Sequence, residues 1–488
     1  MKTLADLSAG IAAPLPPQAG AVRIDGVAID HRQVAPGYLF GAFRGARFDG
    51  ESVIPEAIAN GAVAVVARPE ARVEGAVHIA SDTPRRTFAL LAARWFDRAP
   101  ETLVAVTGTN GKTSTVELLR QIWTLRGERA ASVGTLGVTT ADGTVSTGLT
   151  TPDIVTFLSN MAGLATEGVT HCAFEASSHG LDQYRTEGPR IAAGAFTNLS
   201  RDHLDYHPDM DAYFAAKMRL FDEVVADDGA AVVWADDDWS AQAIEHARRR
   251  GLNTHLVGRN GIFLRLVDRQ PNPLGQRLRL EGEALGGAAR DVKLPLIGAY
   301  QAANALTAAA LATATGSGVD ATLAALERVQ PVRGRLERAA LTRTGAPIYI
   351  DYAHTPEALS AALAALRPHT AGRLICVFGA GGDRDGGKRA PMGAAAVRDA
   401  DLVIVTDDNP RGEDPALIRR AILSGAPGAR EVADRRGAIA AAIAGARGDD
   451  VVVIAGKGHE VGQIVGAGDA MRVLPFDDAA VAREEAGA

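Results

Sequence analysis

The chain has 488 residues, 47% of them hydrophobic and 22% charged, a balance that excludes a disordered or fibrous protein. Its net charge of −7, without a lysine- or arginine-rich block, argues against nucleic acid as a partner. No apolar run approaches the roughly 18 residues of a membrane span, and the N-terminus lacks a long apolar segment, so we expect a cytoplasmic monomer without a membrane span.

The length favours about three domains rather than one hydrophobic core. Residues 1–98 form the first predicted domain, in which short apolar runs such as residues 61–67 alternate with turn-rich segments. Residues 86–100 show a helical pattern that ends at Pro100. Pro100 therefore marks the expected linker to the second domain.

Residues 99–332 form the second predicted domain. A β run at residues 102–108 leads through a glycine turn into a helical pattern at residues 113–127, the element order of a nucleotide-binding α/β domain. An alanine-rich helix is expected at residues 300–316. Further strands are expected at residues 170–177, 192–200 and 230–238.

The turn before the first of these helices has the composition of a phosphate-binding loop. Gly108 and Gly111 lie in the turn, and Lys112 and Thr113 begin the helix. Free N–H groups at a helix N-terminus, a lysine charge and a hydroxyl for Mg²⁺ together suit a triphosphate. The general motif is not fully met, because Val106 stands where its first glycine is expected. The alternative is a glycine turn before an ordinary helix, but Gly-Lys-Thr after a strand favours the nucleotide site.

Two later strand ends carry candidate metal ligands. Glu175 lies in the strand at residues 170–177, and His203 follows the strand at residues 192–200. The carboxyl ends of parallel strands face the crevice where open α/β sheets bind ligands. A carboxylate and an imidazole can meet at one Mg²⁺, although hard cations prefer oxygen and a lone histidine more often caps a loop. From the residues alone, this pair is a weak signal.

Lys217 interrupts an apolar helical stripe formed by positions 210, 213, 214, 220, 221 and 224. A charged lysine there is costly unless its stem follows the apolar face and its ammonium reaches water. The other possibility is reaction with CO₂ to give a carbamate anion, which would fit beside divalent ions. The residues alone leave both possibilities open.

Residues 333–488 form the third predicted domain, which begins where residues 329–337 break the helical periodicity. Helices such as residues 357–366 alternate with strands expected at residues 347–353, 373–382, 401–408 and 450–458. This alternation predicts a mostly parallel sheet with helices on both faces. The expected fold class is therefore α/β with three domains: an N-terminal α/β domain, a central P-loop ATPase-like parallel-sheet domain and a C-terminal Rossmann-like α/β domain.

The two cysteines do not suggest a disulfide. Cys172 and Cys376 lie far apart, each inside an apolar stretch predicted to be a strand. We therefore predict two reduced, buried thiols without a catalytic role.

Short segments along nearly the whole chain resemble motifs of the Mur ligase family of peptidoglycan synthesis. In chain order they are TGTNGKT, EASSHGLDQYR, FTNLSRDHLDYH, AAK, GAYQAANALTA, VRGRLE, DYAHTP, GAGGDRD, DDNPR and AGKGHE. The resemblance is strongest to members that use ATP to add meso-diaminopimelate to UDP-N-acetylmuramoyl-L-alanyl-D-glutamate (UDP-MurNAc-L-Ala-D-Glu). It implies that the glutamyl side-chain carboxylate attacks the γ-phosphate of ATP, and that the incoming amine then displaces phosphate from the acyl phosphate. Mg²⁺ is the implied cofactor.

The resemblance also implies roles for individual residues. The implied catalytic residues are Lys112, Glu175, His203, Lys217, Asn304, Arg335 and Asp351. The implied ATP contacts are Gly108, Thr109, Asn110, Gly111, Lys112, Thr113, Ser114, Asn304 and Arg335. The implied metal ligands are Thr113, Glu175, His203 and carbamylated Lys217. Taken alone, Arg335 could instead form a surface ion pair with Glu337, and Asp351 could cap the helix that begins near Thr355.

For the UDP-sugar peptide, the resemblance implies contacts from Ile29, His31, Asn110, Thr150, Thr151, Ser177, Gln183 and Arg185. Serine is common in the family at the place of His31, which puts the uridine contact in doubt. Arg185 suits an anionic substrate. The implied diaminopimelate contacts are Arg384, Asp408, Asn409, Pro410, Arg411, Gly456 and Glu460.

Arg411 bears on which amino acid is added. Meso-diaminopimelate differs from lysine by a second carboxylate on its distal carbon, and a guanidinium can bind that group through two hydrogen bonds. The DNPR sequence accompanies diaminopimelate in the family. The alternative is an Asn-Pro turn followed by a solvated arginine.

Three other functions compete with the one implied. The first is a lysine-adding ligase of the same fold, and the second is a folylpolyglutamate synthase-like ligase, which should lack the UDP-binding first domain and DNPR. The third is a catalytically silent nucleotide-binding regulator. The intact set of Lys112, Glu175, His203 and Lys217 argues against the regulator.

Overall fold

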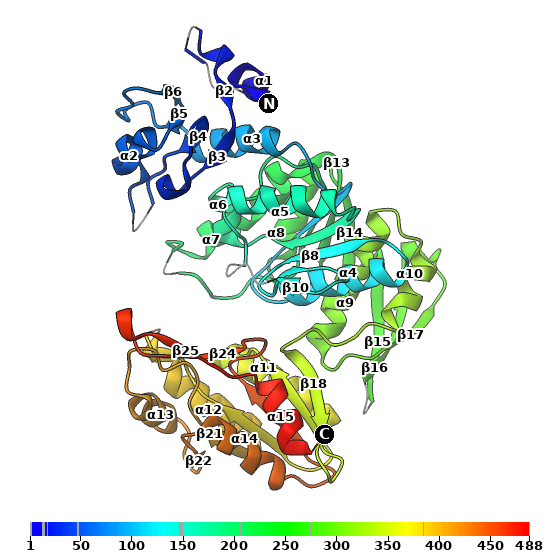
Figure 1. Ribbon diagram of the computed structural model, residues 1–488. Helices are drawn as coiled ribbons and strands as arrows, with labels where there is room; N and C mark the ends of the chain where they lie inside the picture. Colours follow the sequence, from blue (N-terminus) through cyan, green and yellow to red (C-terminus); the bar gives the residue numbers. More distant parts are fainter. Residues whose placement is uncertain are drawn as a thin grey trace. The chain divides into compact units, whose positions relative to one another are not determined.

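The computed structural model describes residues 2–11, 15–16, 18–45, 48–145, 150–204, 206–272, 275–383 and 385–487. The chain folds into two compact units (Figure 1). Unit 1 comprises Met1–Arg265, Gly282–Gly287 and Leu306–Thr322, and unit 2 comprises Leu266–Glu281, Ala288–Ala305 and Leu323–Ala488. In its described residues, unit 1 contains a two-stranded sheet, a four-stranded sheet and strands of an 11-stranded sheet. The boundaries expected after residues 98 and 332 stay predictions.

The N-terminal sheet of unit 1 is parallel, as an α/β domain requires. Its strands, in order, are β3 (Gly26–Ala28), β4 (Tyr38–Gly41), β5 (Ala62–Ala67) and β6 (Val77–Ala80). Side chains alternate between its faces: Val66 of β5 belongs to the core that contains Phe88 of α3 (Pro84–Phe96), whereas Val65 belongs to the core that contains Ile54 of α2 (Ile54–Ala59). The short elements before this sheet are β1 (Lys2–Thr3), α1 (Leu4–Ser8) and β2 (Arg23–Ile24).

The central sheet of unit 1 carries the predicted phosphate loop. Its strands run in the order β10 (Thr144–Val145), β9 (Gly137–Thr139), β8 (Ala130–Gly134), β11 (His171–Glu175), β7 (Thr102–Thr107), β12 (Ile191–Phe196), β13 (Val225–Trp234) and β14 (Asn253–Gly258). All are parallel from β8 to β14, while β9 and β10 form an antiparallel edge. Because β7 lies between β11 and β12, the loops that follow these three strands meet at one edge of the sheet.

The helices of unit 1 include α4 (Lys112–Leu125), α5 (Ile154–Thr166), α6 (Ser178–Asp182), α7 (Met210–Arg219) and α8 (Ser240–Arg249). The α7 helix begins where the Asp209 side chain accepts a hydrogen bond from the Ala212 N–H. It continues into a π-helical turn at Leu220–Val224, which the sequence did not predict. The predicted helix that carries Lys217 is confirmed.

The main sheet of unit 2 has strand order β18 (Arg335–Leu341), β19 (Pro347–Asp351), β23 (Val451–Ala455), β20 (Leu374–Phe378), β21 (Leu402–Val405) and β22 (Arg430–Glu431). Only β18 is antiparallel to its neighbour. One face packs on α11 (Pro356–Leu366), α12 (Arg389–Asp399) and α13 (Pro415–Leu423), and the other on α14 (Arg435–Ala444) and α15 (Asp478–Ala486). The predicted parallel sheet with helices on both faces is confirmed.

The remaining elements of unit 2 include an antiparallel pair, β16 (Gly275–Glu281) and β17 (Arg290–Leu294), and a hairpin, β24 (Gly462–Val465) and β25 (Arg472–Pro475). Residues of β15 (Leu264–Asn272), α9 (Ala299–Ala314) and α10 (Val319–Leu326) are shared between the two units. Among the described residues, no helix is both long and apolar enough to cross a membrane.

Both cysteines are buried in strands, as predicted. Cys172 lies in β11 and Cys376 in β20, and neither forms a disulfide. Burial raises the pKa of both thiols, that of Cys376 to about 12. They are therefore protonated, unreactive core groups at neutral pH.

A buried ion pair connects the two helices on one face of the unit 2 sheet. Arg435, at the start of α14, donates from Nε and Nη2 to the two carboxylate oxygens of Asp478, at the start of α15, over 2.7 Å each. The two side chains are 1% and 0% exposed. Arg435 also donates to the carbonyl oxygens of Asp407 and Ala455, which follow β21 and end β23.

We predict that Asp478→Asn lowers the free energy of unfolding of unit 2 by about 3 to 5 kcal/mol, because it leaves a buried guanidinium without its charged partner. Hydrogen exchange of the amides in β20 and β23 measures this loss. The matched control is Glu485→Gln, which breaks an exposed ion pair with Arg436 and should leave exchange unchanged. Equal protection in both variants would contradict the prediction.

Candidate nucleotide and substrate sites

The phosphate loop connects β7 to α4 and depends on two glycines. Gly108 and Gly111 have φ values of 145° and 86°, in the range that favours glycine. A Cβ atom on Gly108 would lie 1.9 Å from the Thr197 hydroxyl oxygen. The loop therefore passes close to the neighbouring strand β12, and Lys112 and Thr113 open α4 as predicted.

The loop after β12 holds the phosphate loop in shape. The Thr109 N–H donates to the Asn198 carbonyl oxygen and the Asn110 N–H to the Asn198 side-chain oxygen, each over 2.9 Å. The Thr197 hydroxyl donates to the Asn110 carbonyl oxygen over 2.7 Å. These bonds fix the loop that leads into the N-terminus of α4, the end of a helix that attracts anions.

Glu175 ends β11 beside this loop, where a strand-end carboxylate was expected. Its Oε1 accepts hydrogen bonds from the Thr113 hydroxyl over 2.9 Å and from the Thr135 N–H over 2.7 Å. The Glu175 side chain is buried. The structure thus brings two predicted metal ligands, Thr113 and Glu175, into direct contact.

Lys217 does not reach water. It is 1% exposed, and its ammonium donates to the Gly108 carbonyl oxygen over 2.8 Å and lies 4.4 Å from the centre of the Tyr213 ring. Burial, with a smaller contribution from the charge of Lys112, holds the Lys217 pKa well below its usual value. The solvent-exposed alternative considered from the sequence is therefore wrong.

Lys112 shares a hydrogen-bond acceptor with Lys217. Its ammonium donates to the carbonyl oxygens of Gly108 and Thr109 over 2.9 and 2.8 Å. Two lysine nitrogens therefore meet at one backbone oxygen, which favours a neutral Lys217.

His203 follows β12 in a left-handed backbone conformation, with a φ of 53°. Its ring centre lies 4.9 Å from that of His179 and 6.0 Å from that of Tyr213, whose ring also contacts Lys217. Within the described parts of the chain, no three His, Cys, Asp or Glu side chains gather closely enough to hold a metal ion. The predicted metal ligands include a hydroxyl and a modified lysine, which are not among those four residue types. The metal site therefore stays a prediction.

The structure brings together the second group of predicted UDP-sugar-peptide contacts. The Thr151 hydroxyl donates to the Glu175 carbonyl oxygen and accepts from the Ser177 N–H, over 2.8 and 3.0 Å. Arg185 donates to the Thr151 carbonyl oxygen over 2.9 Å and to the Gln183 side-chain oxygen over 2.8 Å. Thr150 joins this group through a 3.1 Å hydroxyl contact with Thr135. These residues line the same sheet edge as Glu175.

Ile29 and His31 lie apart from that group, after β3 of the N-terminal sheet. Ile29 packs on the core, and the His31 carbonyl oxygen accepts a hydrogen bond from the Asn60 side chain. No hydrogen bond among the described residues joins this pair to Thr151. A guanidinium the sequence did not single out does approach the group: the pKa of Arg85, on α3, is lowered by burial and also by the charge of Arg185.

The predicted nucleotide residues of unit 2 form one polar chain. The Asn304 side chain donates to Gln301 over 3.2 Å, and Gln301 donates to the Arg335 carbonyl oxygen over 2.9 Å. The Arg335 guanidinium lies 4.6 Å from the centre of the Tyr352 ring.

Asp351 accepts hydrogen bonds from the N–H groups of Leu336 and Ala353, over 2.8 Å each. The cap of α11 is Thr355, so the capping role considered for Asp351 is wrong. Burial raises the pKa of Asp351 to about 6, against the opposing effects of Arg335 and the two N–H groups.

The predicted diaminopimelate contacts meet at the carboxyl ends of β20, β21 and β23. The Asn409 amide donates to Glu460 Oε2 over 2.8 Å, and Arg411 Nη1 donates to the Gly382 carbonyl oxygen over 2.9 Å. A Cβ atom on Gly456 would lie 2.6 Å from the Asp408 carboxylate. Pro410 lies in the same loop, buried, and Arg384 is outside the described residues.

Sequence reasoning missed several residues that shape these sites. Thr135 binds Glu175, Tyr213 lies between His203 and Lys217, and Lys457 contacts both Asn409 and Glu460. Lys457 had a signal, because it belongs to the AGKGHE motif at the end of the strand predicted at residues 450–458. Thr135 had none, because its role depends on which strands become neighbours, whereas Tyr213 lies in the predicted helix four positions before Lys217, a spacing that places the two side chains on one face.

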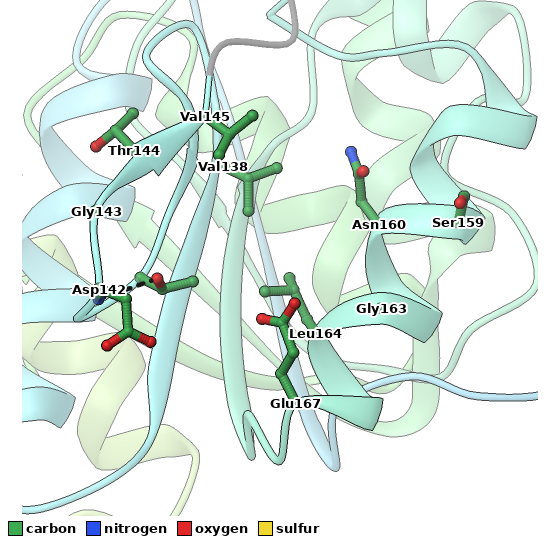
Figure 2. A pocket seen from close by; sticks show the side chains of 11 residues that line it. Val138, Asp142, Gly143, Thr144, Val145, Ser159, Asn160, Gly163, Leu164 and Glu167 are labelled. Atoms are coloured by element: carbon green, nitrogen blue, oxygen red, sulfur yellow. Dashed lines mark hydrogen bonds between the residues drawn. The ribbon is translucent and has the colours of Figure 1, made fainter.

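A pocket of about 430 Å³ lies away from these groups, between the β9–β10 edge and α5 (Figure 2). Figure 2 shows Val138 and Leu164 facing its interior, with Glu167 at its end. Two strands, β8 and β11, separate this edge from β7. The pocket contains none of the predicted site residues.

The sequence matches three family models. They are "Mur ligase family, catalytic domain" over residues 23–103, "Mur ligase middle domain" over residues 106–312 and "Mur ligase, glutamate ligase domain" over residues 334–458. Proteins named UDP-N-acetylmuramoyl-L-alanyl-D-glutamate–2,6-diaminopimelate ligase from Zymomonas mobilis and Caulobacter vibrioides are 56% and 50% identical, each over 94% of this chain and 94% of the relative.

Solved structures agree with these matches. A structure with that same ligase name is 31% identical, with a TM-score of 0.74 and 99% of both chains covered. A MurF structure from Acinetobacter baumannii is 19% identical, with a TM-score of 0.62 over 93% of this chain and 95% of that one. A folylpolyglutamate synthase from Mycobacterium tuberculosis, complexed with ADP, is 22% identical, with a TM-score of 0.62 over 77% of this chain and 91% of that one. The last two share the fold.

The raised pKa of Asp351 predicts a specific pH dependence of stability. Because the folded state binds the Asp351 proton up to about pH 6 and the unfolded state only to 3.8, this group stabilises the fold below about pH 4, and that stabilisation is lost as pH rises through 6. Asp351→Asn should remove this fall in the free energy of unfolding, which urea unfolding at pH values across that range measures. Asp401, whose pKa is lowered chiefly by the Leu374 N–H, is the control of opposite sign. An unchanged pH profile in Asp351→Asn would contradict the assignment.

Proposed function

Because the chain belongs to the Mur ligase family, we propose that it joins meso-diaminopimelate to UDP-MurNAc-L-Ala-D-Glu at the expense of ATP, in peptidoglycan precursor synthesis. The observation that carries the choice of amino acid is the arrangement of Arg411 and Asn409, in the loop after β21, with Glu460, in the loop after β23, where Asn409 donates to Glu460 over 2.8 Å. A nucleotide-linked substrate fits a reaction in the cytoplasm. One chain carries every predicted site residue, which fits a monomer.

The recognition of diaminopimelate follows from charge complementarity. Its distal carbon carries a carboxylate and an ammonium, whereas lysine has only the ammonium there. In the described structure, Arg411 uses one N–H on the Gly382 carbonyl oxygen, which leaves guanidinium donors for the carboxylate. The Glu460 side chain is 33% exposed and would pair with the ammonium. A lysine substrate would leave Arg411 without its partner, which disfavours the lysine-adding alternative.

The ATP half-reaction uses the phosphate loop. The N–H groups at the start of α4 and the Lys112 ammonium would bind the phosphates. The substrate carboxylate oxygen attacks the γ-phosphorus as its bond to the ADP oxygen breaks, which gives an acyl phosphate and ADP. The amine of diaminopimelate then attacks the acyl carbon, and the tetrahedral intermediate releases phosphate and a proton to give the amide.

The donor set beside the loop fits Mg²⁺. The Thr113 hydroxyl and the Glu175 carboxylate provide adjacent oxygens, which this ion prefers, and His203 and carbamylated Lys217 complete the proposed set. When bound, Mg²⁺ would neutralise charge on the phosphates and the substrate carboxylate.

Lys217 is suited to the modification because its lowered pKa favours the neutral amine. The amine nitrogen would bond to the carbon of CO₂ and release a proton, which converts the neutral amine into an anionic oxygen ligand. We keep Asn304, Arg335 and Asp351 as proposed nucleotide contacts, since they belong to one connected polar group.

We predict that Arg411→Ala lowers kcat/KM for meso-diaminopimelate by about 100-fold or more while ATP binding is unchanged, because a charge-assisted, two-point contact is lost. The measurement is phosphate release that depends on both UDP-MurNAc-L-Ala-D-Glu and the amino acid. Arg411→Lys should give an intermediate kcat/KM, since lysine keeps the positive charge but cannot donate two parallel hydrogen bonds to the carboxylate. Arg420→Ala, at an exposed position on α13, is the control. Equal activity of the parent with lysine would overturn the proposed selectivity.

We predict that Lys217→Met lowers the rate of phosphate release by about 100-fold or more, because the proposed carbamate anion beside the reacting phosphates is lost. With ¹³C-bicarbonate, the parent should show a carbamate carbon in its NMR spectrum that the variant lacks. Lys293→Met, at an exposed position on β17, should keep both the signal and the activity. A parent without the carbamate signal would contradict the modification.

A further inference from the structure

Lys457 is a buried lysine for which the proposed reaction has no use. It lies after β23, between Gly456 and Gly458, and is 0% exposed. Its ammonium donates to the Asn409 side-chain oxygen over 3.0 Å, to Glu460 Oε2 over 3.2 Å and to the Gly462 carbonyl oxygen over 2.6 Å. Three acceptors match the three N–H donors of an ammonium, so the burial of this charge is compensated.

The Asn409 amide has one orientation that satisfies its surroundings. Its oxygen accepts from Lys457 and also from the Ile464 N–H of β24, over 2.9 Å. Two donors on that side require the oxygen there and direct the NH₂ group to the opposite side. The NH₂ group accordingly donates to Glu460 Oε2 over 2.8 Å.

The Glu460 carboxylate is therefore fixed through a single oxygen. Oε2 accepts from both Lys457 and Asn409, and no hydrogen bond to Oε1 is present within the described residues. The side chain keeps 33% of its surface exposed. Oε1 is the oxygen left to bind a cation.

Lys457 also connects three segments that carry the recognition groups. Through Asn409 it holds the loop after β21, through Glu460 its own loop, and through Gly462 the first residue of β24. Further along β24, the Ile464 carbonyl oxygen accepts a hydrogen bond from the Arg411 N–H over 3.0 Å. The same segment thus positions the proposed carboxylate-binding and ammonium-binding residues.

We propose that Lys457 is a positioning residue for amino-acid selection: it fixes the Asn409 amide and Glu460 Oε2, and so directs Oε1 toward the distal ammonium of the diamino acid. This inference rests on the proposed function. Lys457 touches neither the substrate nor the reacting atoms. Its effect should appear in discrimination at the distal carbon rather than in ATP chemistry.

The test compares meso-diaminopimelate with 2-aminopimelate, which keeps both carboxylates but lacks the distal amine. In the parent, kcat/KM should favour meso-diaminopimelate by about 10- to 100-fold, the effect of one charged hydrogen-bonded contact. In Lys457→Met this ratio should fall by about tenfold or more, while KM for ATP and for UDP-MurNAc-L-Ala-D-Glu stays unchanged. A purely structural role would lower activity with both amino acids equally and keep the ratio.

Two further variants keep the outcome clear. Lys293→Met removes an exposed lysine charge and should leave the ratio at the parent's value. Lys457→Gln retains an amide donor, so it should fold and give an intermediate ratio. A parental ratio in both Lys457 variants, or failure of both to fold, would overturn the proposal. A parent that releases no phosphate with meso-diaminopimelate would instead overturn the proposed function.

Discussion

The Gly108 carbonyl oxygen accepts hydrogen bonds from Lys112 and Lys217, and the central site depends on this shared acceptor. Two ammonium groups at one buried oxygen repel each other, and burial adds to the cost of the second charge. The pKa of Lys217 falls chiefly because that side chain is buried. The loop thus receives one lysine from α4 and, as proposed, one modifiable amine from α7.

The proposed amino-acid contacts of unit 2 surround a lysine whose buried charge is balanced in a different way. Lys457 is as buried as Lys217 but is surrounded by a carboxylate, an amide oxygen and a carbonyl oxygen, so its charge is matched where it lies. The surroundings of Lys217 therefore favour its proposed modification, whereas Lys457 holds its neighbours in place through three hydrogen bonds. Their surroundings, rather than their exposure, distinguish the two.

Much of this arrangement could be predicted from sequence patterns. Alternating strands and helices predicted the sheets, strand-end positions predicted Glu175 and the loops after β20, β21 and β23, and helical spacing predicted that Lys217 lies on an apolar face. The partners of these side chains could not be predicted, because Lys217 meets an oxygen 109 positions away in the chain. Thr135, Arg85 and the π-helical turn after α7 likewise depend on long-range packing that local patterns do not encode.

Arg435 links α15 to the two strands whose following loops carry the proposed amino-acid contacts. Its guanidinium is bound to Asp478 at the start of α15, and it donates to backbone oxygens at the ends of the strands that precede DNPR and AGKGHE. The first turn of α15 is therefore connected, through one guanidinium, to the ends of β21 and β23. A displacement of α15 would shift the proposed amino-acid contacts without altering any of those residues.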